Sequence, residues 1–288
     1  MIEQVKIIEC PRDAMQGIKS HFIPTEEKAR YINALLKVGF DTIDFGSFVS
    51  PKAIPQMRDT ADVLQLLDLS KTTSKLLAIV ANVRGANDAC VFEEIDYLGY
   101  PFSISENFQM RNTHKTIAES VDVLNDILNI AHKNNKEVVA YLSMGFGNPY
   151  GDPWNVEIVA NWTEKLANMG VKIVSLSDTV GSSTPDVIDY LFSNLIPSYP
   201  NIEFGAHLHT TPLKWHEKVN SAYLAGCRRF DGAIKGYGGC PMAKDDLTGN
   251  MPTEKMLSYF TTNKISTNIK PMSFESSYNK ALEVFNAI

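Results

Sequence analysis

Short apolar runs alternate with longer segments of helical periodicity along most of the chain. The runs are rich in β-branched residues, as in strands of a parallel sheet that is buried on both faces. Eight such runs occur, at residues 5–10, 42–46, 76–81, 95–102, 138–144, 173–178, 204–209 and 229–234. The segments between them carry apolar residues at three- and four-residue spacing, which is typical of crossover helices. The pattern therefore predicts eight consecutive βα units.

Capping residues and glycines lie where this pattern requires helices to begin and end. Thr25 is placed to cap the first long helix, and Gly39 follows that helix. Thr184 precedes Pro185, and proline is favoured in the first turn of a helix. No linker, low-complexity tract or short repeat interrupts the series, so residues 1–288 are expected to form a single catalytic domain.

Two α/β architectures are compatible with eight βα units, a TIM (β/α)8 barrel and a doubly wound open sheet. An open sheet usually carries a glycine-rich phosphate loop after its first strand. Here the first run leads into Cys10-Pro11-Arg12-Asp13 instead, which favours the barrel. Two further amphipathic stretches, about 252–262 and 274–287, follow the eighth unit. We expect these C-terminal helices, within residues 252–288, to pack against the barrel.

Charge and cysteine content narrow the class of function. The formal net charge is −6, which argues against non-specific binding to nucleic acid or to an anionic membrane. No apolar stretch approaches the roughly 20 residues of a membrane span, and residues 1–4 do not have the composition of a signal or transit peptide, so we expect no targeting segment. The four cysteines form no C-x-x-C pair, which indicates free thiols in a reducing compartment. A cytoplasmic protein acting on a small molecule is expected.

Polar residues gather at the expected carboxyl ends of three strands. His207 and His209 stand two residues apart on the seventh strand, so both can point into the barrel. Histidines in a strand are often only hydrogen-bonded residues of the core. Here, however, Arg12 and Asp13 follow the first strand and Asp178 ends the sixth, so polar residues stand at three strand ends. Active sites of this fold lie at that mouth. A divalent-cation site is therefore predicted, with a rim salt bridge as the alternative interpretation of Arg12 and Asp13.

Two further residues have open interpretations. Cys240 lies in the Gly238-Gly239-Cys240-Pro241 loop after the eighth strand. An unperturbed thiol, with a pKa of about 8.5, is mostly protonated at neutral pH and can act as a general acid. The same cysteine could equally be a small buried hydrophobic residue. Asn250 could offer an amide oxygen to a cation or cap a turn.

Together these motifs resemble those of the 3-hydroxy-3-methylglutaryl-CoA lyases, within a larger group of metal-dependent barrel lyases and acyl-CoA synthases. The resemblance extends over almost the whole chain. It is carried by Pro11-Arg12-Asp13 with Gln16, Ser47-Phe48-Val49-Ser50-Pro51-Lys52, Pro55-Gln56-Met57, Asn148-Pro149-Tyr150, Asp178-Thr179 with Gly181 and Thr184-Pro185, His207-x-His209, Gly238-Gly239-Cys240-Pro241, and Gly249-Asn250. The motifs at residues 47–52 and 55–57, together with the loop that contains Cys240, favour the lyase branch over the synthases.

The resemblance implies a divalent cation, Mg2+ or Mn2+, and an acyl-CoA substrate. Implied ligands are Asp13, His207, His209 and Asn250, and this mixture of oxygen and imidazole donors suits Mn2+ somewhat better. The implied catalytic residues are Arg12, which neutralises a developing enolate, Cys240 as the acid, Asp13 and Asp178. The residues implied to bind the substrate are Arg12, Gln16, Asp44, Asn82, Tyr141 and Thr179. The implied reaction cleaves hydroxymethylglutaryl-CoA to acetoacetate and acetyl-CoA.

Four departures from the family pattern put the acyl group in question. Cys10-Pro11 is one residue shorter than usual, and Ala14 replaces a glycine whose φ, if positive, would strain an alanine. Asp44 stands where glutamate is usual, and Thr210 where aspartate is usual. All four implied ligands are nevertheless present.

Two alternatives therefore stay open. One is a lyase, aldolase or synthase of the same barrel group that acts on a related 3-hydroxyacyl-CoA or hydroxy-oxo acid. The other is a barrel that binds metal and acyl-CoA without turnover. A homodimer is compatible with the sequence.

Overall fold

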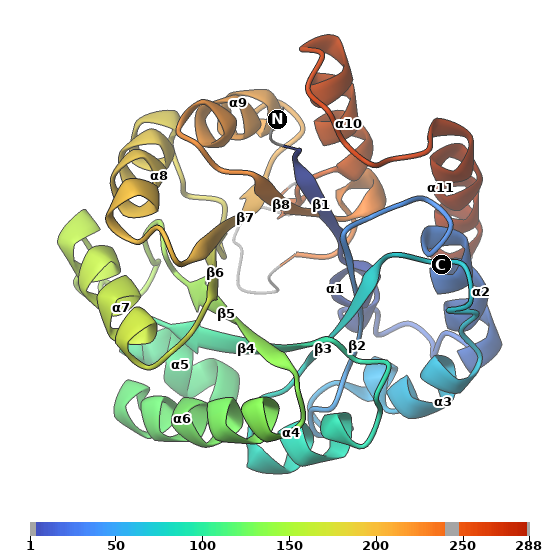
Figure 1. The fold of residues 1–288 in the computed structure, drawn as a ribbon, viewed down its shortest axis with the longest axis horizontal. Coiled ribbons are helices and arrows are strands. Elements are labelled where there is room, and N and C mark those ends of the chain that lie inside the picture. Colours follow the sequence, from blue (N-terminus) through green and yellow to red (C-terminus); the bar gives the residue numbers. More distant parts are fainter. Residues whose placement is uncertain (1–3, 240–247, 287–288) are drawn as a thin grey trace.

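The computed structural model describes residues 4–239 and 248–286, and their fold is a closed barrel of parallel strands inside a ring of helices (Figure 1). Each barrel strand pairs in parallel with the next one along the chain, and β8 pairs with β1 to close the barrel. The strands are β1 (Lys6–Glu9), β2 (Thr42–Ser47), β3 (Lys75–Ile79), β4 (Tyr97–Ser103), β5 (Glu137–Ser143), β6 (Ile173–Asp178), β7 (Glu203–Thr210) and β8 (Arg229–Gly232). The predicted barrel is thus confirmed.

The helices lie around the strands, most of them on the outside of the barrel in the connections between successive strands (Figure 1). They are α1 (Pro11–Gln16), α2 (Thr25–Leu35), α3 (Thr60–Gln65), α4 (Val83–Cys90), α5 (Glu106–Thr113), α6 (Ile117–Lys133), α7 (Val156–Asn168), α8 (Pro185–Ser198), α9 (Trp215–Leu224), α10 (Thr253–Thr262) and α11 (Pro271–Asn286). Short 3-10 turns η1 (Pro55–Met57) and η2 (Ile234–Gly236) and a two-residue strand β9 (Gly249–Asn250) complete the described elements.

The two C-terminal helices occupy different places on the barrel. Helix α10 packs against α9 and β8, where the eighth unit of the barrel requires its helix. Helix α11 lies beyond it, against α2 (Figure 1). Within the described ranges, no helix is both long and apolar enough to cross a membrane.

Local signals in the sequence identified one helix start correctly and another incorrectly. The side chain of Thr184 accepts a hydrogen bond from the backbone N–H of Val187, as predicted for the cap of α8. Thr25, in contrast, is the first residue of α2, and Pro24 occupies the cap position. The Thr25 hydroxyl instead donates to the Asp59 carboxylate, at 2.8 Å. A tertiary partner has therefore replaced the local capping bond.

The interior of the barrel is packed with side chains below the mouth. Inward-facing residues form a separate apolar cluster, made of Leu77, Ile79, Tyr97, Val139, Tyr141 and Ile173. A larger apolar core fills the space between the strands and the outer helices. Because the lower interior is filled, a ligand is accommodated at the carboxyl ends of the strands, where polar residues were predicted.

Glu9 is a fully buried carboxyl group at the end of β1. It accepts hydrogen bonds from the backbone N–H of Ile234, at 2.9 Å, and from the Thr253 hydroxyl, at 2.6 Å. These contacts join β1 to the beginning of α10. Burial raises the pKa of Glu9 to about 8, although both hydrogen bonds oppose this rise. The neutral form is therefore the favoured one in the folded protein at pH 7.

Replacing Glu9 with glutamine is expected to stabilise the protein increasingly as the pH rises. Between the ordinary pKa of 4.5 and the folded value of about 8, only the folded state keeps the proton, so the wild-type chain loses stability with increasing pH. Each unit of difference in pKa is worth about 1.4 kcal/mol. Thermal unfolding at pH 5, 7 and 9 measures the effect. A gap between Glu9→Gln and wild type that does not change with pH would contradict it.

Candidate active site

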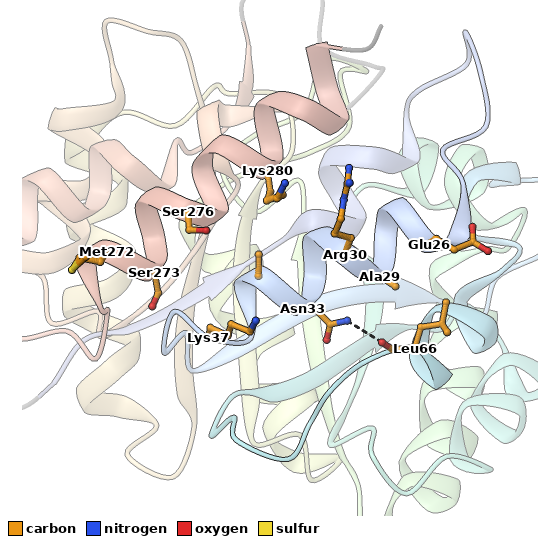
Figure 2. Close-up of a pocket in the computed structure, with 11 residues that line it drawn as sticks. Glu26, Ala29, Arg30, Asn33, Lys37, Leu66, Met272, Ser273, Ser276 and Lys280 are labelled. Atoms are coloured by element: carbon orange, nitrogen blue, oxygen red, sulfur yellow. Dashed lines mark hydrogen bonds between the residues drawn. The ribbon is translucent and has the colours of Figure 1, made fainter.

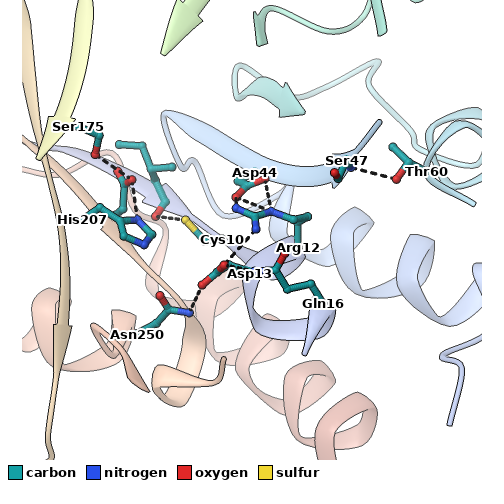
Figure 3. A network of polar contacts seen from close by, with 12 residues as sticks. Cys10, Arg12, Asp13, Gln16, Asp44, Ser47, Thr60, Ser175, His207 and Asn250 are labelled. Carbon is teal, nitrogen blue, oxygen red and sulfur yellow. Dashed lines mark hydrogen bonds and ion pairs between the residues drawn. The ribbon is translucent and has the colours of Figure 1, made fainter. Parts of the chain in front are cut away.

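A cavity of about 360 Å³ opens at the carboxyl ends of the strands. It collects residues that are far apart in the sequence, including Arg12 and Asp13 from α1, Ser47 from β2, and His207 and His209 from β7. Figure 3 shows Arg12, Asp13 and His207 converging there from α1 and β7. The predicted meeting of strand-end polar residues at one mouth is therefore present in the structure.

Asp13, His207 and His209 form a cluster suited to a cation. Potential ligand atoms of the three side chains all lie within 4.8 Å of one another. Alternation along β7 directs both imidazoles inward, and α1 begins directly after β1, which carries Asp13 to the same place. Strand β9 runs antiparallel to β7, with Asn250 opposite His209. The side-chain nitrogen of Asn250 thereby donates to Asp13 Oδ2 at 2.6 Å.

Each imidazole is oriented by a partner at Nδ1. His207 Nδ1 lies 3.1 Å from Asp231 Oδ2, and His209 Nδ1 lies 3.0 Å from the carbonyl oxygen of Thr179. Because a carbonyl oxygen only accepts hydrogen bonds, Nδ1 of His209 carries the proton and Nε2 carries a lone pair. His209 Nε2 is buried and has no hydrogen-bond partner among the described residues. Such an unsatisfied nitrogen is what a metal ligand requires.

The electrostatics of the cluster favour a bound positive charge. Burial would raise the pKa of Asp13, but Arg12 and the two imidazoles outweigh it, so the pKa is lowered and Asp13 is ionised. Burial, together with the neighbouring His207, lowers the pKa of His209 to about 4, so this imidazole is neutral at pH 7. Burial also lowers the pKa of His207, but its hydrogen bond to Asp231 and the charge of that carboxylate raise it overall.

The donor set fits a divalent cation. One carboxylate and two imidazoles are available without rearrangement, and this mixture suits a first-row divalent cation. Asn250 is adjacent, but its amide nitrogen faces Asp13 Oδ2 and also donates to the Tyr237 carbonyl at 2.8 Å. Ligation through its oxygen requires half a turn of the amide. The location of Asn250 therefore agrees with a fourth ligand, whereas its present orientation does not.

A second group of potential ligands, Cys10, His207 and Asp231, lies deeper in the barrel. Its geometry is less suitable, because the His207–Asp231 hydrogen bond already uses the facing atoms. Burial also raises the pKa of the Cys10 thiol, so the thiolate that would bind a metal is disfavoured. We therefore infer that this group orients His207, and we do not assign a metal ion to it.

Arg12 bridges two carboxylates at the edge of the cavity. Its Nε lies 3.1 and 3.0 Å from the two oxygens of Asp44, and its Nη1 lies 3.0 Å from Asp13 Oδ1. Burial raises the pKa of Asp44 to about 6, although Arg12 opposes this rise. Asp44 is completely buried and does not line the cavity. The structure therefore places Asp44 behind Arg12, which it contacts, and not among the residues that line the cavity.

Four other predicted substrate-binding residues line the cavity: Gln16, Asn82, Tyr141 and Thr179. Gln16 donates to Asp13 Oδ1 at 2.6 Å, whereas the oxygen of Asn82 caps α4 by accepting from the Gly85 N–H. The hydroxyl of Tyr141 is buried and lacks a hydrogen-bond partner within the described ranges. Because this oxygen is buried, the ring of Tyr141 and not its hydroxyl faces the cavity.

The remaining predicted site residues lie elsewhere. Asp178 ends β6, but its carboxylate lies behind the cavity wall in a buried ion pair with Lys218. Cys240 falls outside the described residues, although the preceding Gly239 lines the cavity. Ala14 is helical and does not have a positive φ, so the expected strain at this departure is absent.

Sequence reasoning missed two residues that hydrogen-bond to members of the cluster. Asp231 lies in the middle of β8 and orients His207, and Lys218 lies on the buried face of α9. The signals available in the sequence were a carboxylate beside Phe230 in a predicted strand and a lysine beside Val219 and Ala222 in a predicted helix. Each is a charged residue at a position that the structure buries.

Another hollow lies on the outer wall, between α2 and α11 (Figure 2). Two of its charged side chains pair with carboxylates at its rim, Arg30 with Glu27 and Glu283, and Lys280 with Glu283. Asn33 donates to the Leu66 carbonyl across its floor. No group of potential metal ligands was found here among the described residues. The hollow lies away from the strand ends, so we do not assign it a role in the reaction.

Comparison with known proteins agrees with this geometry. Residues 4–279 match the family described as HMGL-like. A hydroxymethylglutaryl-CoA lyase of Bacillus subtilis is 34% identical over 90% of this chain and 86% of its own. A 3-hydroxy-3-isohexenylglutaryl-CoA/hydroxy-methylglutaryl-CoA lyase of Pseudomonas aeruginosa is 30% identical over 93% of this chain and 88% of its own. An HMG-CoA lyase structure from Acinetobacter baumannii, in complex with coenzyme A and 3-methylmalate, superimposes with a TM-score of 0.90 at 27% identity, covering 99% and 92% of the two chains.

Proposed function

Because the chain belongs to the HMGL-like family, we propose that it is a divalent-metal-dependent carbon-carbon lyase that cleaves 3-hydroxy-3-methylglutaryl-CoA to acetoacetate and acetyl-CoA. The observation that carries this proposal is the cluster of Asp13, His207 and His209 in the same cavity as Arg12. A cation-binding cluster next to a fixed guanidinium suits a substrate with several oxygens on which negative charge develops.

The proposed ligands are Asp13, His207 and His209, with Asn250 as the fourth after its amide has turned. The bound cation, Mg2+ or Mn2+, would lower the pKa of the substrate hydroxyl. Arg12 faces the same cavity and would neutralise the enolate that forms when the carbon-carbon bond breaks. Asp44 and Asp13 hold the guanidinium in place for this role.

Two proton transfers complete the reaction. The hydroxyl proton must leave before the bond breaks, and Asp13 or a group held by the cation is the proposed base. The enolate of acetyl-CoA must then be protonated, and we propose the thiol of Cys240 as the acid. This is supported by Gly239, the neighbouring residue, which lines the cavity.

The cavity is also compatible with a related substrate that carries a larger alkyl group. The Pseudomonas relative is named for an isohexenyl as well as a methyl substituent. In this chain Ile79, Ala81, Pro101 and Val49 form an apolar part of the cavity lining. A 3-hydroxyacyl-CoA with a larger alkyl substituent is thus a second candidate substrate.

We further propose a cytoplasmic location, because Cys10, Cys90 and Cys227 are free thiols, as in reducing compartments.

Product analysis tests the proposal directly. Purified protein with Mn2+ is expected to release acetoacetate from hydroxymethylglutaryl-CoA and to stop on complete chelation. Cys240→Ala is expected to lower kcat by about 10²–10⁴-fold, the usual contribution of a general acid. Cys90→Ala, on the outer helix α4, is the matched control and should retain full activity. Acetoacetate release that survives chelation would exclude the metal from the mechanism, and full activity of Cys240→Ala would exclude the thiol.

A further inference from the structure

Lys218 is a completely buried lysine that lies next to the cluster without lining the cavity. Its side chain is 0% exposed, and its Nζ makes three hydrogen bonds. The partners are Asp178 Oδ2 at 2.7 Å, the carbonyl oxygen of His209 at 2.8 Å and the carbonyl oxygen of Gly181 at 3.1 Å. All three donors of the ammonium group are therefore used.

These bonds join three segments around the cavity. Asp178 ends β6, Gly181 belongs to the loop that follows it, and His209 is near the end of β7. The loop is held further by Ser183, whose backbone N–H and hydroxyl both donate to Asp178. The ammonium and the carboxylate form a neutral pair, so Lys218 adds no net positive charge beside a cation site.

His209 is fixed at both ends by this arrangement. Its backbone carbonyl accepts from Lys218, and its Nδ1 contacts the carbonyl of Thr179, the residue after Asp178. Lys218 therefore holds the imidazole and the carbonyl that orients it in one unit. If the two strand ends moved apart, the Nδ1 contact would weaken and Nε2 would turn away from Asp13 and His207.

We propose that Lys218 is a positioning residue for the metal site. Its ammonium group holds the end of β6 against the end of β7, so that His209 presents a deprotonated Nε2 to the cation. This inference rests on the proposed metal site. It also gives Asp178 a specific part, as the counterion of Lys218 and the anchor of the loop that contains Thr179.

Lys218→Met tests the proposal, because methionine keeps much of the buried volume and removes the three hydrogen bonds. Titration of metal-free protein with Mn2+, followed by electron paramagnetic resonance of the free ion, should show binding weaker by about 10–100-fold, as for other partners of metal ligands. Lys28→Met is the matched control. Lys28 is also buried and paired with a carboxylate, Asp59 at 2.6 Å, but its hydrogen bonds go to Asp59 and to the Gln56 carbonyl and not to a residue of the cluster, so its loss should leave Mn2+ affinity unchanged.

The double variant Lys218→Met/Asp178→Asn separates the positioning effect of Lys218 from the effect of its charge. It removes the three hydrogen bonds of Lys218 but leaves no unpaired buried carboxylate at Asp178. Its Mn2+ affinity should stay as weak as that of Lys218→Met; recovery to the wild-type value would show that charge alone matters and would overturn the proposal. Histidine 15N spectra of the metal-free proteins should show His209 with Nδ1 protonated in wild type and mixed tautomers in both variants. An unchanged spectrum and affinity in Lys218→Met would also overturn it. If wild type itself bound no Mn2+, the metal site would be wrong and this inference with it.

Discussion

Replacing Arg12 with methionine is expected to lower kcat by about 10²–10³-fold, the usual effect of removing one fixed donor to a developing anion. The Mn2+ affinity should stay at the wild-type value or rise, because a positive charge next to Asp13 is lost. The variant should still fold. Without Arg12, the already raised pKa of Asp44 increases further, so this carboxyl group becomes neutral instead of remaining as an unpaired buried charge.

Steady-state kinetics together with Mn2+ titration measure this prediction. Arg58→Met is a suitable control, because Arg58 lies over the ring of Phe22 and does not line the cavity. A change in KM with an unchanged kcat would mean that Arg12 only binds the substrate. Weaker Mn2+ binding would mean that Arg12 acts by holding Asp13 in place.

His209→Leu is expected to weaken Mn2+ binding by more than about 100-fold, because even the residues that orient metal ligands change metal affinity by about 10–100-fold. Activity should fall in parallel. The side chain is almost wholly buried, and leucine fills a similar volume, so the loss should come from the missing Nε2 and not from unfolding. The new variant leaves the Thr179 carbonyl without its donor, which we expect to lower thermal stability moderately.

The control for this variant is His132→Leu, in an exposed position of α6. Isothermal titration with Mn2+, at a pH well above the pKa of about 4 of His209, keeps the wild-type imidazole neutral throughout. Binding within threefold of wild type would show that His209 is not a ligand.

The fold was predictable because its signals are local. Apolar runs such as 138–144 and 173–178 identified strands without reference to any partner, and the missing glycine-rich loop after the first strand favoured the barrel. The ends of elements were less predictable. Residues 233 and 234 were predicted to belong to the eighth strand, but β8 ends at Gly232. The backbone N–H of Ala233 donates instead to the Met251 carbonyl.

The candidate site was predictable as far as the fold itself brings strand ends together. Asp13, His207 and His209 could be placed at one mouth because all three follow or end strands of a parallel barrel. Their supporting partners could not, because these depend on particular pairs of side chains. Asp231 is 24 residues from His207, and Lys218 is 40 residues from Asp178, with no periodic relation between them. Only the register of neighbouring strands and the rotation of α9 decide these pairs.

Closure of the barrel has a consequence for how the chain is made. The first strand lacks one of its two neighbours until β8 has been synthesised, and the first long helix, α2, waits for α11 at the opposite end of the chain. A growing polypeptide therefore exposes the unpaired backbone edge of β1 and one side of α2 until β8 and α11 have been synthesised. Folding of this protein should consequently be slow, dominated by contacts distant in sequence, and dependent on protection of the nascent chain.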